Sequence, residues 1–319
     1  MHETKIRSFS LFLILSIAFI SCGPEMHDRP LRLGTNIWLG YEPLYLAREM
    51  NFFDKNPIRL VEATSNSEVI QAFRNNALDA AALTLDEVLL LAQSGIDLRV
   101  ILIIDFSHGA DVIMGQPGLA GFKDVKGKRI GVENTAVGAY MLARALQMNG
   151  LTQEDVYIVP LEINEHERAF VEKKIDAIVT FEPVYSKLLV KGGQKLFDSS
   201  LIPGEIVDVL IVRTEYLQKN RQKVNTLFQG WFQALAYLEE RPNDAAAVMT
   251  ARLGITVDQV LKSLNGLRFP DQTENRQMIS GTGGIIIETG ENLIRFMREQ
   301  NLLRKQIDMA SLIENGRWE

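Results

Sequence analysis

Five acidic side chains are the residues of this sequence best suited to chemistry, because each is expected beside the carboxyl end of a strand: Asp86, Asp105, Glu133, Glu182 and Asp208. Clustered carboxylates without cationic partners repel one another, and no arginine or lysine lies in the same loops. We therefore expect a ligand that carries positive charge or several N–H donors, such as an amine or a pyrimidine-like heterocycle. Asp86 and Glu182 have a second interpretation, since each could instead cap the helix that follows it.

The other candidate ligand contacts are aromatic or polar residues of these loops: Trp38, Tyr41, Thr84, Ser107, Asn134 and Thr135. Trp38 and Tyr41 could stack on a ring or on a cation, although Trp38 could equally pack in the core. Asn134 and Thr135 open a predicted helix, whose unpaired N–H groups and positive dipole end favour anions or carbonyls. One of these two is expected to cap that helix, which does not exclude ligand contact.

No pattern typical of an enzyme is found in the sequence. There is no Gly-x-Ser-x-Gly elbow, and His166-Glu167 begins like a zinc motif but has Phe170 where the second histidine would stand. The glycine-rich segment 121–129 has the wrong spacing for a phosphate loop. We therefore expect no catalysis, no metal and no cofactor.

The single cysteine, Cys22, directly follows an apolar run from Phe9 to Ile20 that Lys5 and Arg7 precede. The run is long enough for a signal peptide and too short for a membrane-spanning helix. Ser21-Cys22 resembles a bacterial lipobox, in which the cysteine is acylated and becomes the mature N-terminus, although Phe19 replaces the usual leucine. This predicts a signal at 1–22, a tether at 23–30 and an exported protein of the cell envelope with a lipid anchor. An ordinary secretory signal with an incidental cysteine is the alternative.

Strand and helix patterns alternate along the chain, which predicts an α/β fold with largely parallel sheets. Strands are expected at 31–35, 58–62, 80–83, 98–104, 129–132, 156–160, 177–179 and 207–213, with helices between them and at 221–238, 244–252, 257–265 and 273–299. Asp79–Thr84 is repeated at Asp176–Thr180, and Gly34 is matched by Gly131, which suggests two lobes of common architecture.

Length and charge agree with this organisation. A chain of 319 residues favours two domains, and its net charge of −6 without a dense basic run argues against nucleic acid as a partner. Two expected crossings, at 105–112 and 205–209, would make a hinge. A hinged pair of lobes encloses a ligand cleft.

Six segments, in this order, resemble the substrate-binding proteins of ABC importers for nitrate, sulfonate, taurine and hydroxymethylpyrimidine-type ligands. They are residues 34–47 (GTNIWLGYEPLYLA), 77–81 (ALDAA), 107–111 (SHGAD), 127–133 (GKRIGVE), 181–183 (FEP) and 267–275, where LRFPD precedes Glu274 and Asn275. The resemblance covers residues 31–300 and implies a two-lobed periplasmic binding protein fold of type II. Lobe 1 would hold residues 31–112 and 207–319, and lobe 2 would hold 113–206.

The resemblance also implies a monomer that passes its small-molecule ligand to an ABC permease in the membrane. One alternative is a sensor component that presents its ligand to a membrane kinase or cyclase. Another is a scaffolding lipoprotein with a degenerate cleft.

Overall fold

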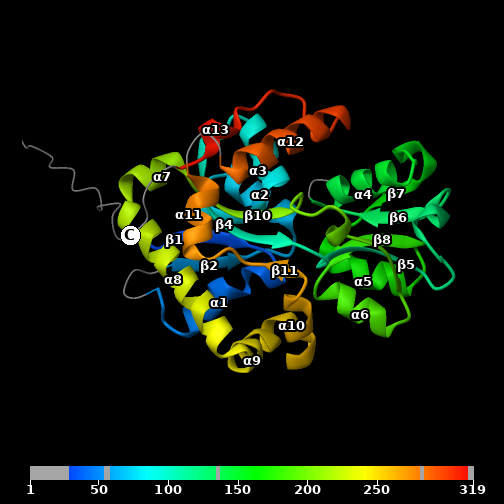
Figure 1. Cartoon of the computed structure of the whole chain (residues 1–319), viewed down its shortest axis with the longest axis horizontal. Coiled ribbons are helices and arrows are strands. Elements are labelled where there is room, and N and C mark those ends of the chain that lie inside the picture. The colour runs from blue at the N-terminus through cyan, green and yellow to red at the C-terminus, as the bar shows by residue number, and fades with distance from the viewer. Residues whose placement is uncertain (1–28, 54–57, 134–136, 281–283, 315–319) are drawn as a thin grey trace, which may run out of the picture.

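The computed structural model describes residues 29–53, 58–133, 137–280 and 284–314, which form two α/β lobes side by side (Figure 1). The predicted signal segment and Cys22 lie outside the described residues, and so do Asn134 and Thr135. Within the described ranges, no helix combines the length and the apolar character needed to cross a membrane.

Lobe 1 is built on a mixed sheet with the strand order β11-β4-β10-β3-β1-β2. Its strands are β1 (Leu31–Thr35), β2 (Ile58–Glu62), β3 (Ala80–Thr84), β4 (Leu98–Ser107), β10 (Val207–Arg213) and β11 (Leu267–Arg268). β1 pairs in parallel with β2 and β3, whereas β10 runs antiparallel to both β3 and β4. The predicted parallel arrangement is therefore right for β1–β3, and the returning strand β10 makes the centre antiparallel.

Lobe 2 is built on a second sheet with the order β7-β6-β8-β5-β9. Its strands are β5 (Asp111–Gly115), β6 (Arg129–Val132), β7 (Tyr157–Pro160), β8 (Ala177–Phe181) and β9 (Gln194–Asp198). β5 runs antiparallel to β8 and β9, as β10 does to β3 and β4 in lobe 1. Five strands of lobe 1, in the order β2-β1-β3-β10-β4, therefore correspond to the five strands β7-β6-β8-β5-β9 of lobe 2, which supports the interpretation of the sequence repeat.

The repeat extends to side-chain contacts at the start of matched strands. Arg32 Nε donates to Asp79 Oδ2 at 3.0 Å, and Arg129 Nε donates to Asp176 Oδ2 at 3.1 Å. In each pair the aspartate also accepts the backbone N–H of the arginine, at 3.0 and 2.9 Å. The aspartates thus tie β1 to β3 in lobe 1 and β6 to β8 in lobe 2.

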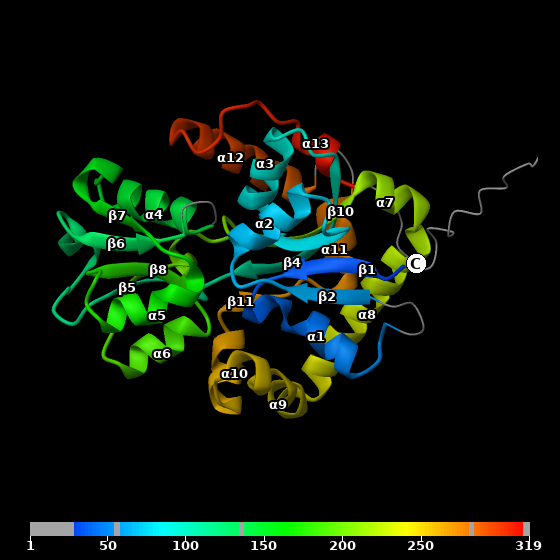
Figure 2. The same ribbon diagram turned by 180° about the vertical axis from the view of Figure 1, so that it is seen from behind.

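Helices cover both faces of each sheet (Figures 1 and 2). They are α1 (Glu42–Glu49), α2 (Asn66–Arg74), α3 (Leu85–Gln93), α4 (Val137–Met148), α5 (Ile163–Val171), α6 (Val184–Val190), α7 (Thr214–Lys219), α8 (Arg221–Glu240), α9 (Pro242–Leu253), α10 (Val257–Leu264), α11 (Gln272–Ile279), α12 (Ile285–Glu299) and α13 (Met309–Leu312). Neighbouring strand residues point to opposite faces: Ala81 and Leu83 join the core beneath α2 and α3, and Ala80 and Ala82 join the core beneath α1 and α8.

One expectation about the elements is wrong, and three strands were missed. The single helix predicted at 273–299 is two helices, α11 and α12, because three of residues 281–284 are glycines, which disfavour helix. A Cβ on Gly284 would also overlap the backbone carbonyl of Met278. The strands β5, β9 and β11 were not predicted separately, since their pairing partners lie far away in the sequence.

Asp79→Asn should lower the free energy of unfolding by about 2 kcal/mol, since the Asp79 side chain is only 2% exposed and accepts from both Arg29 and Arg32. The matched change Asp176→Asn should cost less than about 1 kcal/mol, because that side chain is 30% exposed. Urea unfolding of both variants measures the difference. Equal losses would contradict the burial argument.

Candidate ligand-binding site between the lobes

A small cavity lies between the two lobes, where the strand ends of both sheets meet. Residues of both lobes line it. Those of lobe 1 are Asn36, Trp38, Tyr41, Asn66, Thr84 and Asp208, and those of lobe 2 are Asp111, Val137 and Phe181. Its volume is about 10 Å³, roughly the space of one water molecule. The lobes are therefore closed on their own side chains.

Aromatic side chains close this cavity from opposite lobes. The Trp38 ring of lobe 1 meets the Phe181 ring of lobe 2 edge to face, with centroids 5.3 Å apart and an interplanar angle of 90°. Trp38 is only 4% exposed, so it packs in the core as one interpretation expected. It also lines the cavity, as the other interpretation expected. Tyr41 donates its hydroxyl to Asp208 Oδ1.

Carboxylates gather around the cavity, and five of them are buried: Asp86, Glu87, Asp105, Asp111 and Asp208. Asp208 on β10 is paired in register with Asp105 on β4. Trp38 Nε1 donates to Asp105 Oδ2 at 3.3 Å. Glu87 accepts from Asn66 Nδ2 at 2.6 Å. Lobe 2 contributes Asp111, which begins β5; the sheet of lobe 2 therefore starts at residue 111, and not at residue 113 as expected from the sequence.

Burial dominates the titration of these groups. It raises the pKa of Asp86 to about 6 and the pKa of Asp111 to about 7. Burial, reinforced by the charge of Asp105, raises the pKa of Asp208 well above its usual value. Burial likewise raises the pKa of Asp105, and burial together with the charge of Asp86 raises that of Glu87. The cleft therefore favours either bound protons or a cationic guest.

No cationic side chain offsets these charges. Throughout residues 29–53, 58–133, 137–280 and 284–314, no arginine, lysine or histidine forms an ion pair with any of the five carboxylates. The buried oxygens that lack a hydrogen-bond partner in the described structure include three carboxyl or amide oxygens at the cavity: Asp105 Oδ1, Asp111 Oδ2 and Asn66 Oδ1. An unpaired buried acceptor is costly, so these atoms favour a guest that brings N–H or O–H donors.

Two of the predicted contacts, Glu133 and Glu182, do not line the cavity but join the lobes. Glu133 Oε1 accepts from Ser67 Oγ at 2.9 Å, and Glu182 Oε1 accepts from Ser263 Oγ at 2.7 Å. Glu182 Oε2 also accepts Ser186 N in the first turn of α6, as the capping interpretation expected. The alternative that Asp86 caps α3 is wrong, because the N-cap residue is Thr84.

The other predicted contact residues lie either in the cavity lining or outside it. Trp38, Tyr41, Thr84 and Asp208 line the cavity, and Asp105 bonds to Trp38. Ser107 lies at the crossing between the lobes, outside the cavity lining, where its hydroxyl is 2.8 Å from Ser199 Oγ. Sequence reasoning missed several lining residues, namely Asn36, Asn66, Asp111, Val137 and Phe181. Asn36, Val137 and Phe181 lie in the loops that strand-end reasoning selects, whereas only tertiary packing brings in Asn66 and Asp111.

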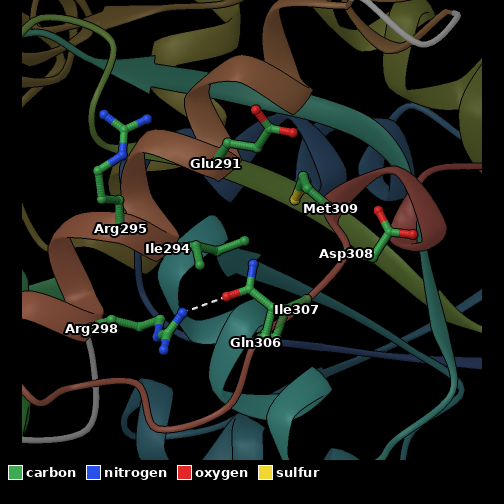
Figure 3. Close-up of a pocket in the computed structure, with 8 residues that line it drawn as sticks. All are labelled: Glu291, Ile294, Arg295, Arg298, Gln306, Ile307, Asp308 and Met309. Carbon is green, nitrogen blue, oxygen red and sulfur yellow. Dashed lines mark hydrogen bonds between the residues drawn. The ribbon is translucent and has the colours of Figure 1, made fainter.

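A larger hollow, about 470 Å³, lies on lobe 1 between α12 and residues 306–309 (Figure 3). Arg295 and Arg298 face it together with Glu291 and Asp308. All four side chains are exposed to water and of mixed charge. Exposed side chains of both charges do not indicate which kind of ligand would bind there, so the interlobe cavity remains the candidate site.

Two lobes of repeated topology, joined by crossings and closed over a cavity, define a periplasmic binding protein fold of type II. Solved structures agree with this class. The alkanesulfonate-binding protein SsuA from Xanthomonas axonopodis pv. citri bound to MOPS matches with a TM-score of 0.77 at 19% identity, over 89% of this chain and 98% of that chain. The periplasmic nitrate-binding protein NrtA from Synechocystis PCC 6803 matches with a TM-score of 0.71 at 11% identity, over 88% and 84%.

The sequence matches the model of the NMT1-like family over residues 25–254, and the chain belongs to that family. This match confirms the family resemblance that the sequence segments indicated. A protein of Bacillus subtilis (strain 168), provisionally named an aliphatic sulfonates-binding protein, is 24% identical over 96% of this chain and 94% of its own length.

Gly40→Ala should lower the free energy of unfolding by about 1–3 kcal/mol, because the added Cβ would overlap both Asp105 Oδ2 and Trp38 Nε1. Guanidinium unfolding followed by tryptophan fluorescence measures the loss. Gly121→Ala is the matched control, since nothing lies within 4 Å of the Cβ that it adds. A similar cost for both variants would contradict the close approach at Gly40.

Asp111→Asn should stabilise the ligand-free protein at pH 8 by about 2–4 kcal/mol and leave it nearly unchanged at pH 4. The pKa of Asp111, about 7 when folded, exceeds its unfolded value, so the folded state holds more protons between about pH 4 and pH 7. The stability of the wild type therefore falls as the pH rises through this range, and asparagine removes that contribution. Unfolding curves across pH measure it. The Asp244→Asn change, at an exposed position of α9, is the control for the same substitution outside the cleft.

Proposed function

We propose that this chain is the extracytoplasmic solute-binding protein of an ABC-type importer, and that it holds a positively charged small molecule between its lobes. The family membership supports the binding role, and so do the similarities to proteins named as sulfonate-binding and nitrate-binding. In this role the protein catalyses no reaction on its ligand. Its partner is an ABC permease, which receives the ligand from the monomeric binding protein.

The charge of the ligand is inferred from one observation: five buried carboxylates share the cleft without a cationic side chain among the described residues. A sulfonate or nitrate would bring a negative charge into a cleft in which burial already disfavours the ionised form of each carboxyl group. A cation neutralises it, and its N–H groups can reach the unpaired oxygens of Asp105 and Asp111. Ring faces at Trp38 and Phe181 favour an amine or an aminated heterocycle of pyrimidine type.

The lobes hold the ligand by closing over it. Asp105 and Asp208 stand on lobe 1 and Asp111 stands on lobe 2, so a cation between them attracts both lobes. Its affinity for the closed form over the open form sets how far it shifts the equilibrium. The closed protein then docks on the permease. We further propose that acylated Cys22 anchors the protein to the membrane through the tether 23–30.

A thermal-shift screen tests the ligand class with amines, aminopyrimidines, alkylsulfonates and nitrate. At ~100 times its dissociation constant, a ligand should stabilise the protein by ~2.7 kcal/mol. We expect this with an amine or an aminopyrimidine, and we expect Asp105→Asn to reduce that affinity at least tenfold. Asp244→Asn is the exposed control. Stabilisation by sulfonate or nitrate alone would refute the cationic ligand and leave the binding role intact.

Cys22→Ser should release the protein from the membrane fraction into the soluble envelope fraction, because the acyl chains would be lost. Metabolic labelling with a radioactive fatty acid should mark the wild-type chain and leave the variant unlabelled. Labelling of both chains, or of neither, would contradict an anchor at Cys22.

A further inference from the structure

The cavity between the lobes is too small for a ligand, since its volume is about 10 Å³. The Trp38 ring lines it and packs edge to face against Phe181 of the opposite lobe. The indole N–H donates to Asp105 at 3.3 Å. Trp38 therefore supplies the ring and the N–H donor that the proposed ligand would supply.

The first polar contact between the lobes is made by Glu133, which follows β6 of lobe 2. Its Oε1 accepts Ser67 N at 3.1 Å and Ser67 Oγ at 2.9 Å, at the N-terminal end of α2 in lobe 1. Glu133 is 4% exposed. A carboxylate is favoured beside a helix N-terminus, so Glu133 caps a helix that belongs to the other lobe.

The second polar contact is made by Glu182, which follows β8 of lobe 2. Its Oε1 accepts Ser263 Oγ at 2.7 Å from α10 of lobe 1 and Ser186 Oγ at 2.9 Å from α6 of its own lobe. Glu182 is 2% exposed. Glu133 and Glu182 thus reach different helices of lobe 1, which fixes the closed arrangement at two separate places.

We propose that the ligand-free protein closes on itself, with Trp38 in the place of the ligand and with Glu133 and Glu182 latching lobe 2 to lobe 1. The inference rests on the proposed function only in locating the ligand in this cleft. Neither glutamate lines the cavity, so the latch holds whether or not a ligand is present. A ligand must then enter during opening and displace Trp38, and the small open fraction lowers its apparent affinity.

Electron-spin distance measurements on the ligand-free chain test this directly. Spin labels at Val190→Cys on α6 and Asp258→Cys on α10, both exposed positions, report the gap between the lobes in a Cys22→Ser background. We expect one short, narrow distance. The double variant Glu133→Ala, Ser263→Ala should add a longer distance to the measured distribution. Each lost hydrogen bond should raise the fraction of open molecules about fivefold.

Ser186→Ala is the matched control, because it removes a partner of Glu182 without touching the contact between the lobes. It should keep the short distance. Trp38→Phe retains a ring against Phe181, so the distance between the spin labels should remain short. Trp38→Ala removes that ring, so the distance should become longer.

A long or broad distance in the unmodified background would overturn the proposal, as would identical distances in all variants. This experiment uses no ligand, so its outcome does not depend on the ligand screen. If the distances disprove the latch, the proposal of a cationic ligand is not affected.

Discussion

The cost of burying negative charge without a counter-charge governs the cleft between the lobes. Asp105 and Asp208 are brought face to face because β10 returns antiparallel to β4, and closure of the lobes adds Asp111 from β5. Burial raises the pKa of each of the three carboxyl groups. The cleft is thus a site whose stability depends on protons or on a cation, and this links its electrostatics to the class of ligand.

Buried carboxylates have two different roles in this fold. Glu133 and Glu182 lie beside serine donors of the opposite lobe, so their charge stabilises the closed arrangement. Asp105 and Asp111 each keep an oxygen without a hydrogen-bond partner in the described structure. The first pair of residues can hold the lobes together without a ligand. The second pair leaves acceptors that a ligand would satisfy.

The sequence was informative where a local signal exists. Strand and helix alternation predicted most elements, and the repeat of Asp79 at Asp176 predicted two lobes of common architecture, which the matched strand orders support. Strand-end reasoning also located the cleft. It did not distinguish Glu182, a latch, from Asp208, which lines the cavity, because that difference depends on which lobe supplies the nearest donor. Asn66 was missed for the same reason, since tertiary packing alone brings α2 to the cavity.

Carboxyl carbon NMR of the ligand-free protein, with aspartate labelled by ¹³C and followed across pH, tests the central claim most directly. The account predicts one resonance that titrates near pH 7 and disappears in Asp111→Asn, and another near pH 6 that disappears in Asp86→Asn. It also predicts that Asp105 and Asp208 remain protonated well above pH 4. Titration of all four groups near pH 4 would mean that their charge is already compensated, which would contradict a cleft built for a cation.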